Sequence, residues 1–237
     1  MVEEVIVGAL ATNCWIYPLE QAEDSGGNAK PKDQGRPCAL IDPGADAEAI
    51  ISQLESLGLY PEYILLTHGH FDHIGALGPL AAHYSQHKPV IGIHRMDAGR
   101  IGRNAYKAHR LDFNSMGIPD ADLVGPLGLY IEALRRGLPE PGRLLEDGDR
   151  IGPFTVIHLP GHSPGSIGFY DEARDLIFDG DVLFQNGIGR TDLPGGNWDE
   201  MLQSLKKLFT LNGKTRVYPG HGPATTLADE RRQFASL

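Results

Sequence analysis

The stretch Thr67-His-Gly-His-Phe-Asp-His73 constrains the chain more than any other. Three histidines and one aspartate lie between positions 68 and 73. Such a group is hard to hide in a core, because each buried imidazole or carboxylate needs its own hydrogen-bond partner. One histidine alone would more often be an ordinary residue. The density of these residues therefore predicts a metal site.

Three more apolar stretches end in residues of the same kind. The four strand-like stretches and the residues that follow them are 64–66 before His68, His70, Asp72 and His73; 156–157 before His158 and His162; 176–178 before Asp179 and Asp181; and 217–218 before His221. In α/β sheets, ligand sites gather beyond strand ends. Glycines beside these residues allow tight turns toward a common centre. The pattern predicts one shared site.

The remaining periodicity favours an α/β fold. We expect strands at 5–7, 14–17, 38–41, 63–66, 90–93, 154–159, 166–170, 175–178 and 215–218. Helices are expected at 46–57, shortly after Gly75, at 197–208 and from Thr226. We predict a single domain over residues 1–237, with loop excursions at about 20–37 and 95–142.

Composition narrows the class of protein. With 237 residues, 41% of them hydrophobic, the chain is an ordinary globular one. Its net charge of −10 argues against nucleic-acid binding, which draws on clustered Lys and Arg. There is no run of about 20 apolar residues and no basic leader, so no membrane segment and a cytoplasmic location are expected. Cys14 and Cys38 are predicted to be buried thiols.

Residues 67–73 match in full the T-H-x-H-x-D-H signature of the metallo-β-lactamase superfamily, which the chain resembles. The resemblance extends to the Asp42-Pro-Gly turn, Gly161-His-Ser-Pro-Gly165, Asp179-Gly-Asp181 and Pro219-Gly-His-Gly-Pro223. It implies an αββα sandwich, in which two central mixed sheets are flanked by helices.

The resemblance also implies a ligand set for two divalent metal ions. It places His68, His70 and His162 on the first metal, Asp72, His73 and His221 on the second, and Asp181 between them. Asp72 and Asp181 would thus also take part in catalysis. A set of imidazoles and carboxylates without a thiolate suits zinc, and it also accepts iron or manganese.

Two such cations explain how a hydrolase would work. Ions about 3.5–4 Å apart can share a hydroxide, because they lower the pKa of the parent water to about 7. They also polarise a carbonyl and stabilise the oxyanion that forms. A separate general base is then hardly needed.

Within the superfamily, the chain most resembles the short glyoxalase II-like hydrolases. The resemblance rests on the stretches 181–184 and 187–196, and on 220–226 with Glu230. It implies a small-molecule thioester substrate of the S-lactoylglutathione type. The chain ends too soon after His221 for the helical domain with which glyoxalase II binds glutathione, which leaves glutathione specificity open. Arg190 would grip a substrate carboxylate or pair with Asp192.

Several alternatives remain at this stage. A related group, the persulfide dioxygenases, uses one iron on the residues that match His68, His162 and Asp181. A lactonase, a β-lactamase or a purely structural metal protein is also compatible with the motif, whereas a nuclease is disfavoured by the acidic balance. Gly161-His-Ser-Pro-Gly165 mimics a serine nucleophile elbow, but Pro164 lacks the N–H that the oxyanion hole needs. Oligomeric state is left open, and His94 and His109 are expected at the surface.

Overall fold

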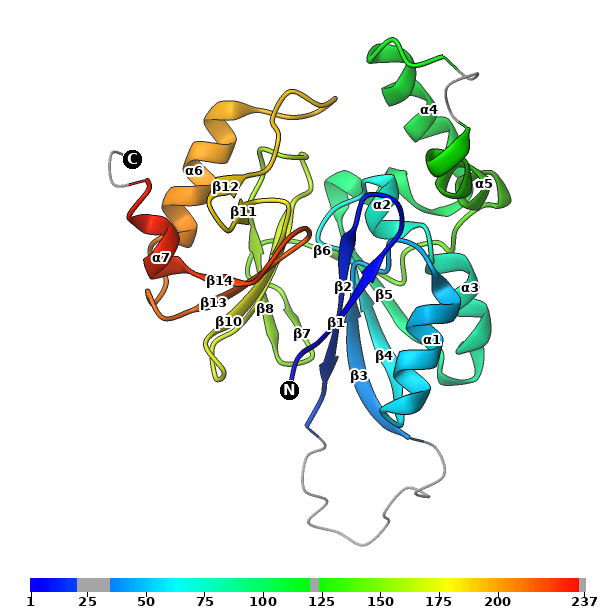
Figure 1. Cartoon of the computed structure of the whole chain (residues 1–237), viewed down its shortest axis with the longest axis horizontal. Coiled ribbons are helices and arrows are strands. Elements are labelled where there is room, and N and C mark those ends of the chain that lie inside the picture. The colour runs from blue at the N-terminus through cyan, green and yellow to red at the C-terminus, as the bar shows by residue number, and fades with distance from the viewer. Residues whose placement is uncertain (21–34, 120–123, 235–237) are drawn as a thin grey trace, which may run out of the picture.

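Two β-sheets face each other at the centre of the protein, and helices cover the outer face of each (Figure 1). The structure is a computed structural model, which describes residues 1–20, 35–119 and 124–234. Each sheet has six strands and mixes parallel with antiparallel pairs. The predicted αββα architecture is confirmed.

The first sheet comes from the N-terminal part of the chain. Its strands, in spatial order, are β1 (Glu3–Val7), β2 (Thr12–Pro18), β3 (Arg36–Ile41), β4 (Leu59–Leu65), β5 (Val90–His94) and β6 (Arg143–Leu145). The pairs from β3 to β6 are parallel. Because parallel strands end at the same edge, the loops after β3, β4 and β5 lie side by side.

The second sheet comes from the C-terminal part. Its strands, in spatial order, are β14 (Thr225–Thr226), β13 (Arg216–Pro219), β10 (Leu176–Gly180), β9 (Ile167–Asp171), β8 (Phe154–His158) and β7 (Arg150–Ile151). Only β10 and β13 run parallel. A separate small hairpin joins β11 (Leu183–Phe184) to β12 (Gly187–Ile188).

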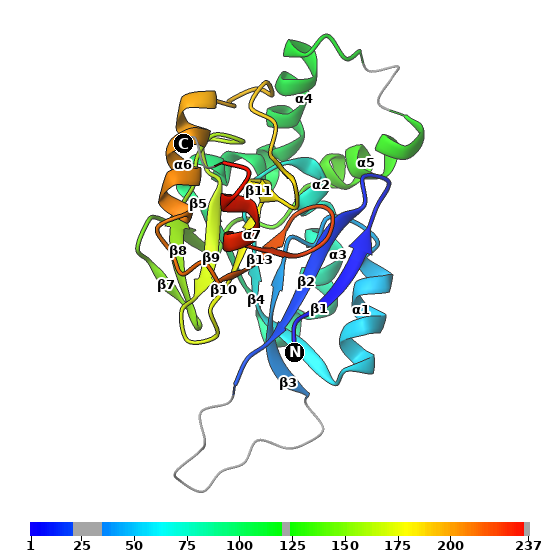
Figure 2. The same ribbon diagram turned by 60° about the vertical axis from the view of Figure 1, so that its left-hand side comes forward.

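Helices form the two outer layers. Those on the side of the first sheet are α1 (Ala47–Ser56), α2 (Phe71–Ile74), α3 (Leu77–His83), α4 (Ala105–Ser115) and α5 (Gly128–Arg136). On the other side lie α6 (Trp198–Leu208) and α7 (Leu227–Arg231), as the turned view makes clear (Figure 2). Short 3-10 turns complete the fold: η2 (Ser85–His87), η3 (Arg95–Arg100), η4 (Gly102–Asn104) and η6 (Gly125–Leu127). None of the helices in this described part of the chain has the length and apolar character needed to cross a membrane.

Alternation along the strands builds the layers. In β2, Cys14 and Ile16 pack against the helices, whereas Trp15 and Tyr17 point into the space between the sheets. This two-residue period is the natural repeat of a strand. Aromatic rings such as Phe154 and Phe178 fill the space between the sheets from the other side. The sandwich therefore has one core between its sheets and one under each helical layer.

Most predicted elements match the structure. Asn197 caps α6 by accepting hydrogen bonds from the backbone N–H groups of Asp199 and Glu200, and Gly58 follows α1 with a positive φ of 62°. Both cysteines are buried and free, as expected. The predicted excursion at 20–37 falls mostly on residues 21–34, which lie outside the described residues.

The region 95–142 differs from the prediction, because α4 and α5 form there. The prediction of surface positions for His94 and His109 is also wrong, since their exposed fractions are 5% and 2%. His94 stacks on His158 with 4.2 Å between ring centroids, and His109 lies on the buried face of α4. Neither belongs to the residue groups described below that can hold a metal ion.

Candidate metal centre

The first four candidate residues follow β4 at the edge of the first sheet. His68 and His70 lie in the loop between β4 and α2, and Asp72 and His73 lie within α2. A close approach of the turn after β3 holds this segment in place. A Cβ on Gly44 would lie 1.7 Å from the backbone oxygen of Asp72, so only glycine fits there.

The other three candidates follow strands of the second sheet. His162 lies in the loop between β8 and β9, Asp181 follows β10, and His221 follows β13. The parallel pairing of β10 with β13 brings Asp181 and His221 to the same edge. Gly220 is needed at this point, because a Cβ there would lie 2.2 Å from Asp181 Oδ1.

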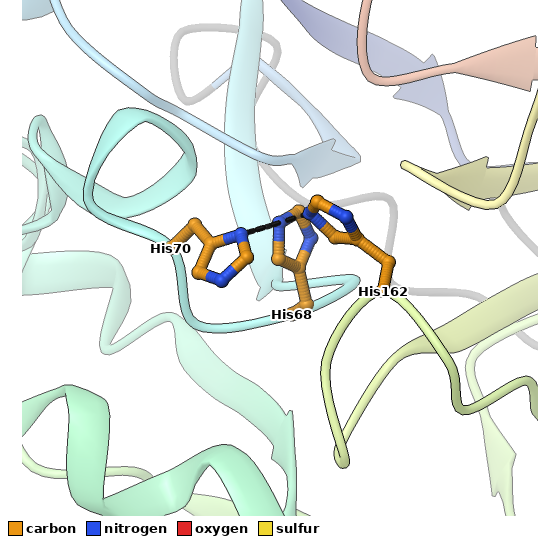
Figure 3. Close-up of side chains that lie close together, drawn as sticks. All are labelled: His68, His70 and His162. Atoms are coloured by element: carbon orange, nitrogen blue, oxygen red, sulfur yellow. Dashed lines mark hydrogen bonds between the residues drawn. The ribbon is translucent and has the colours of Figure 1, made fainter. Parts of the chain in front are cut away.

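His68, His70 and His162 form one compact group (Figure 3). His70 Nδ1 lies 3.1 Å from His68 Nε2 and 2.8 Å from His162 Nε2. The rings meet nearly edge to face, so their nitrogens point at one another from two different loops. Three ring nitrogens that converge in this way form a potential metal site.

Asp72, His73 and His221 form a second group. Asp72 Oδ2 lies 3.5 Å from His73 Nε2 and 3.3 Å from His221 Nε2. Asp181 lies between the two groups: its Oδ1 is 3.5 Å from His73 Nε2, and its Oδ2 is 3.4 Å from His162 Nε2 and 3.7 Å from His221 Nε2. All seven predicted residues are thus brought together.

Hydrogen bonds on the far side of the rings fix their orientation. His73 Nδ1 donates to Asp42 Oδ2, His162 Nδ1 to the backbone oxygen of Arg190, and His221 Nδ1 to that of Ala11. His68 Nδ1 faces Thr67 Oγ1, which itself donates to Asp42. In each of these four rings the outer Nδ1 is therefore engaged and Nε2 points inward, as in metal-binding histidines.

Two inward atoms have no hydrogen-bond partner. His73 Nε2 and Asp181 Oδ1 are both buried and unsatisfied. A buried polar atom without a partner destabilises the fold unless an ion or a water molecule binds it. Because the donor set consists of imidazole nitrogens and carboxylate oxygens, divalent metal ions fit these residues.

Charge differs between the two groups. Burial lowers the pKa values of His68 and His70 well below the usual range, and neighbouring imidazoles lower them further. These rings are neutral, as metal ligands must be. Burial also acts to lower the pKa of His73, but Asp72, Asp181 and Asp42 outweigh it and raise that pKa to about 10. The second group thus favours positive charge at its centre.

The structure adds supporting contacts that the sequence motifs had not indicated. Asp42, in the turn after β3, accepts hydrogen bonds from the backbone N–H and the hydroxyl of Thr67, at 2.8 and 2.6 Å, as well as from His73. Thr12, from the β1–β2 hairpin, donates its hydroxyl proton to Asp72 at 3.4 Å. The adjacent Asn13 donates to the backbone oxygens of Pro219 and Gly222, on both sides of His221. The N-terminal hairpin therefore ties the two halves together.

Other residues singled out in the sequence lie apart from the cluster. The Arg190 guanidinium is exposed and forms two hydrogen bonds with Asp192, at 2.9 and 2.8 Å. Arg190 reaches the site through its backbone oxygen, so a substrate contact by its side chain stays a prediction. The hydroxyl of Ser163 donates to Asp97, which agrees with the rejection of a nucleophile elbow. Asp179 accepts a hydrogen bond from the backbone N–H of Leu183.

Comparisons with known proteins agree with this geometry. The profile described as the Metallo-beta-lactamase superfamily matches residues 33–221. Hydroxyacylglutathione hydrolase GloC of Haemophilus influenzae is 36% identical over 202 residues, which cover 84% of this chain and 87% of that protein.

Two solved structures are also similar over almost the whole chain. TTHA1623, described in a di-iron-bound form, is 35% identical and has a TM-score of 0.72. The match covers 97% of this chain and 97% of that chain. The BLEG-1 B3 metallo-beta-lactamase is 32% identical, also with a TM-score of 0.72, and the match covers 98% of this chain and 97% of that one. The chain therefore belongs to the metallo-beta-lactamase superfamily and is one of its metal-dependent hydrolases.

Proposed function

We propose that this chain hydrolyses small-molecule thioesters of the hydroxyacylglutathione type and uses two divalent metal ions. The observation that carries the proposal is the position of Asp181, within 3.7 Å of ligand atoms from both groups. The thioester class is supported by the 36% identity with a hydroxyacylglutathione hydrolase.

In this proposal one ion would be held by His68, His70 and His162 and the other by Asp72, His73 and His221. Asp181 lies between the two groups and would be a ligand to either ion. When bound, such a pair of ions makes a nucleophile available at neutral pH and polarises the carbonyl of the substrate. Zinc or iron suits these donors, and manganese is a third option. The similar protein in a di-iron-bound form supports iron as a candidate.

The chain's own residues hold and orient this centre. Asp42 and the backbone oxygens of Arg190 and Ala11 occupy the outer nitrogens of three rings, so those rings can only present Nε2. Fixed ligands need no reorganisation during the reaction, which is how preorganised sites lower a barrier. With Asp181 shared, each ion would have four protein ligands, and a substrate atom would bind as a fifth.

The test is a comparison of substrates on metal-loaded protein. S-lactoylglutathione, an acyl-coenzyme A, a lactone and a β-lactam are each incubated with the enzyme, and product is measured. Glutathione persulfide is assayed in parallel for oxygen uptake. We expect the highest kcat/KM with a thioester. Oxygen uptake with persulfide and no thioester hydrolysis would overturn the proposal in favour of a dioxygenase, and preference for the β-lactam would favour a lactamase.

A matched pair of variants links turnover to the centre. His162→Ala removes a proposed ligand. His158→Ala removes a histidine at the end of β8 whose ring stacks on His94 and donates a hydrogen bond to the backbone oxygen of Pro164. We expect the first to lower kcat by at least about 100-fold, as when a group that stabilises developing charge is lost. The second should keep kcat within a few-fold. Equal activity of both variants would refute the assignment.

A further inference from the structure

A buried aspartate outside the seven-residue cluster joins two of the loops that carry its histidines. Asp97 lies in η3, has an exposed fraction of 0%, and accepts three hydrogen bonds. Its Oδ2 accepts from the backbone N–H of Gly69 at 2.9 Å and from the Ser163 hydroxyl at 2.7 Å. Its Oδ1 accepts from the backbone N–H of Gly165 at 2.9 Å.

Each donor is a near neighbour of one group of histidines. Gly69 stands between His68 and His70, whereas Ser163 and Gly165 follow His162. These loops belong to different sheets, at the ends of β4 and β8. Asp97 therefore connects the loop that carries His68 and His70 to the loop that carries His162. None of its three hydrogen bonds is made to the segments that carry Asp181 and His221.

The turn η3 packs closely against both loops. A Cβ on Gly165 would lie 2.5 Å from Asp97 Cγ, and a Cβ on Gly69 would lie 2.7 Å from Arg100 Cβ. The Ser163 hydroxyl also lies 2.9 Å from Ser166 Oγ, which accepts the backbone N–H of Ser163. The turn η3 therefore lies in direct contact with both loops.

We propose that Asp97 is a positioning residue for one half of the metal centre. It sets the separation of His162 from His68 and His70, and so controls metal binding by the three-histidine group more than by Asp72, His73 and His221. The inference rests on the proposed function, because it takes the first group as a metal site. It also gives a role to the beginning of the 95–142 region.

A purely structural role makes a different prediction, and the chain offers a matched control. Asp171 is also buried, with an exposed fraction of 3%, and accepts hydrogen bonds from the Tyr17 hydroxyl and from the backbone N–H of Arg174. It lies at the far end of β9 from the loop that carries His162. Loss of either carboxylate should lower the Tm, but only loss of Asp97 should change metal binding.

The experiment compares Asp97→Asn and Asp171→Asn with the unaltered chain. Each protein is stripped of metal and titrated with Co²⁺ against a chromophoric chelator, and the visible spectrum of the bound cobalt is recorded. We expect two ions in the unaltered chain and in Asp171→Asn, with equal affinities. In Asp97→Asn we expect one site unchanged and the other weaker by about 10- to 100-fold, as for the loss of outer partners of metal ligands. The cobalt spectrum of the weakened site should change.

Each other outcome decides the matter as well. Unchanged binding by Asp97→Asn, or equal weakening of both sites, would overturn the inference while leaving the two-metal proposal intact. Failure of the unaltered chain to bind two ions would overturn the proposed centre and the inference with it. Ser163→Ala guards against misfolding of the first variant, because it removes one donor only. It should weaken the same site by about two- to tenfold, and no effect there would contradict the inference.

Discussion

Replacement of Asp42 by asparagine should weaken both the fold and the second half of the metal centre. Asp42 has an exposed fraction of 1% and accepts three hydrogen bonds, two from Thr67 and one from His73. Its φ of 51° is one that asparagine tolerates well, so the backbone should not be strained by the change. The variant therefore reports on the lost hydrogen bonds.

The structure sets the size of the effect. An amide keeps one oxygen and turns an NH₂ group toward a donor, which leaves at least one buried donor without an acceptor. One or two such donors cost about 1–3 kcal/mol each, so the free energy of unfolding of the metal-free protein should fall by about 1–6 kcal/mol. His73 also loses the acceptor that fixes its tautomer, and affinity for one metal ion should drop about 10- to 100-fold.

Urea denaturation in the presence of a chelator measures the first effect, and a metal titration measures the second. Asp171→Asn serves as the control, since it removes a buried carboxylate remote from the site. We expect the control to lose stability without losing metal affinity. A free energy of unfolding for Asp42→Asn within about 0.5 kcal/mol of the unaltered value, together with unchanged affinity, would refute the reasoning, because surface-like changes have that size.

Three further predictions follow from buried groups. Burial, together with the nearby Arg100, lowers the pKa of His109 to about 4. As the pH falls, His109 is therefore protonated near pH 6.5 in the unfolded chain but only near pH 4 in the folded chain. Between these pH values the free energy of unfolding should fall by about 3 kcal/mol with decreasing pH. Denaturation curves recorded across this range should show that His109→Gln lacks this part of the pH dependence. An unchanged pH dependence would contradict the prediction. Burial raises the pKa of Cys38 to about 12 and that of Cys14 well above its usual range, so a thiol reagent at pH 8 should label neither cysteine until denaturant is added. Rapid labelling of the folded protein would show the thiols to be accessible. Gly220→Ala would place a Cβ 2.2 Å from Asp181 Oδ1 and 2.6 Å from His73 Cε1, so metal affinity should fall at least about tenfold, whereas Gly187→Ala, with nothing within 4 Å, should bind metal normally; equal affinities would mean that the cluster readily adapts.

The strands and the convergence of the cluster could be predicted because their signals are local. Alternation such as Cys14, Trp15, Ile16 and Tyr17 gives each strand two apolar faces, which is what a sheet buried on both sides requires. Strand ends then bring distant motifs to one edge. The αββα architecture itself came from the resemblance of the whole set of motifs.

The helices α4 and α5 were missed because their buried faces are weakly apolar or short. In α4 the buried positions are Ala105, His109 and Phe113, of which only the last is a large hydrophobic residue. In α5 the buried positions fall within nine residues. A pattern of this kind carries too little periodicity to stand out from an irregular segment.

The supporting roles of Asp42 and Asp97 were missed for a different reason. Asp42 and Asp97 act through hydrogen bonds to residues 25 to 68 positions away, and nothing in the local sequence marks such partners. The exposure of Arg190 likewise depends on how its loop packs, because the same Gly-Arg-Thr-Asp segment could turn either way. Tertiary contacts decide these positions, and local spacing does not record them.

The most direct test of the account follows thioester hydrolysis while metal is returned to stripped protein. S-lactoylglutathione is supplied, the released thiol is measured, and zinc or iron is added in known equivalents. A two-metal centre predicts no turnover without metal and a rise that ends at two equivalents per chain, with Asp181→Asn inactive at every point. Full turnover by the stripped protein, or no turnover by protein shown to hold two ions, would contradict the claim that this site is a two-metal thioester hydrolase.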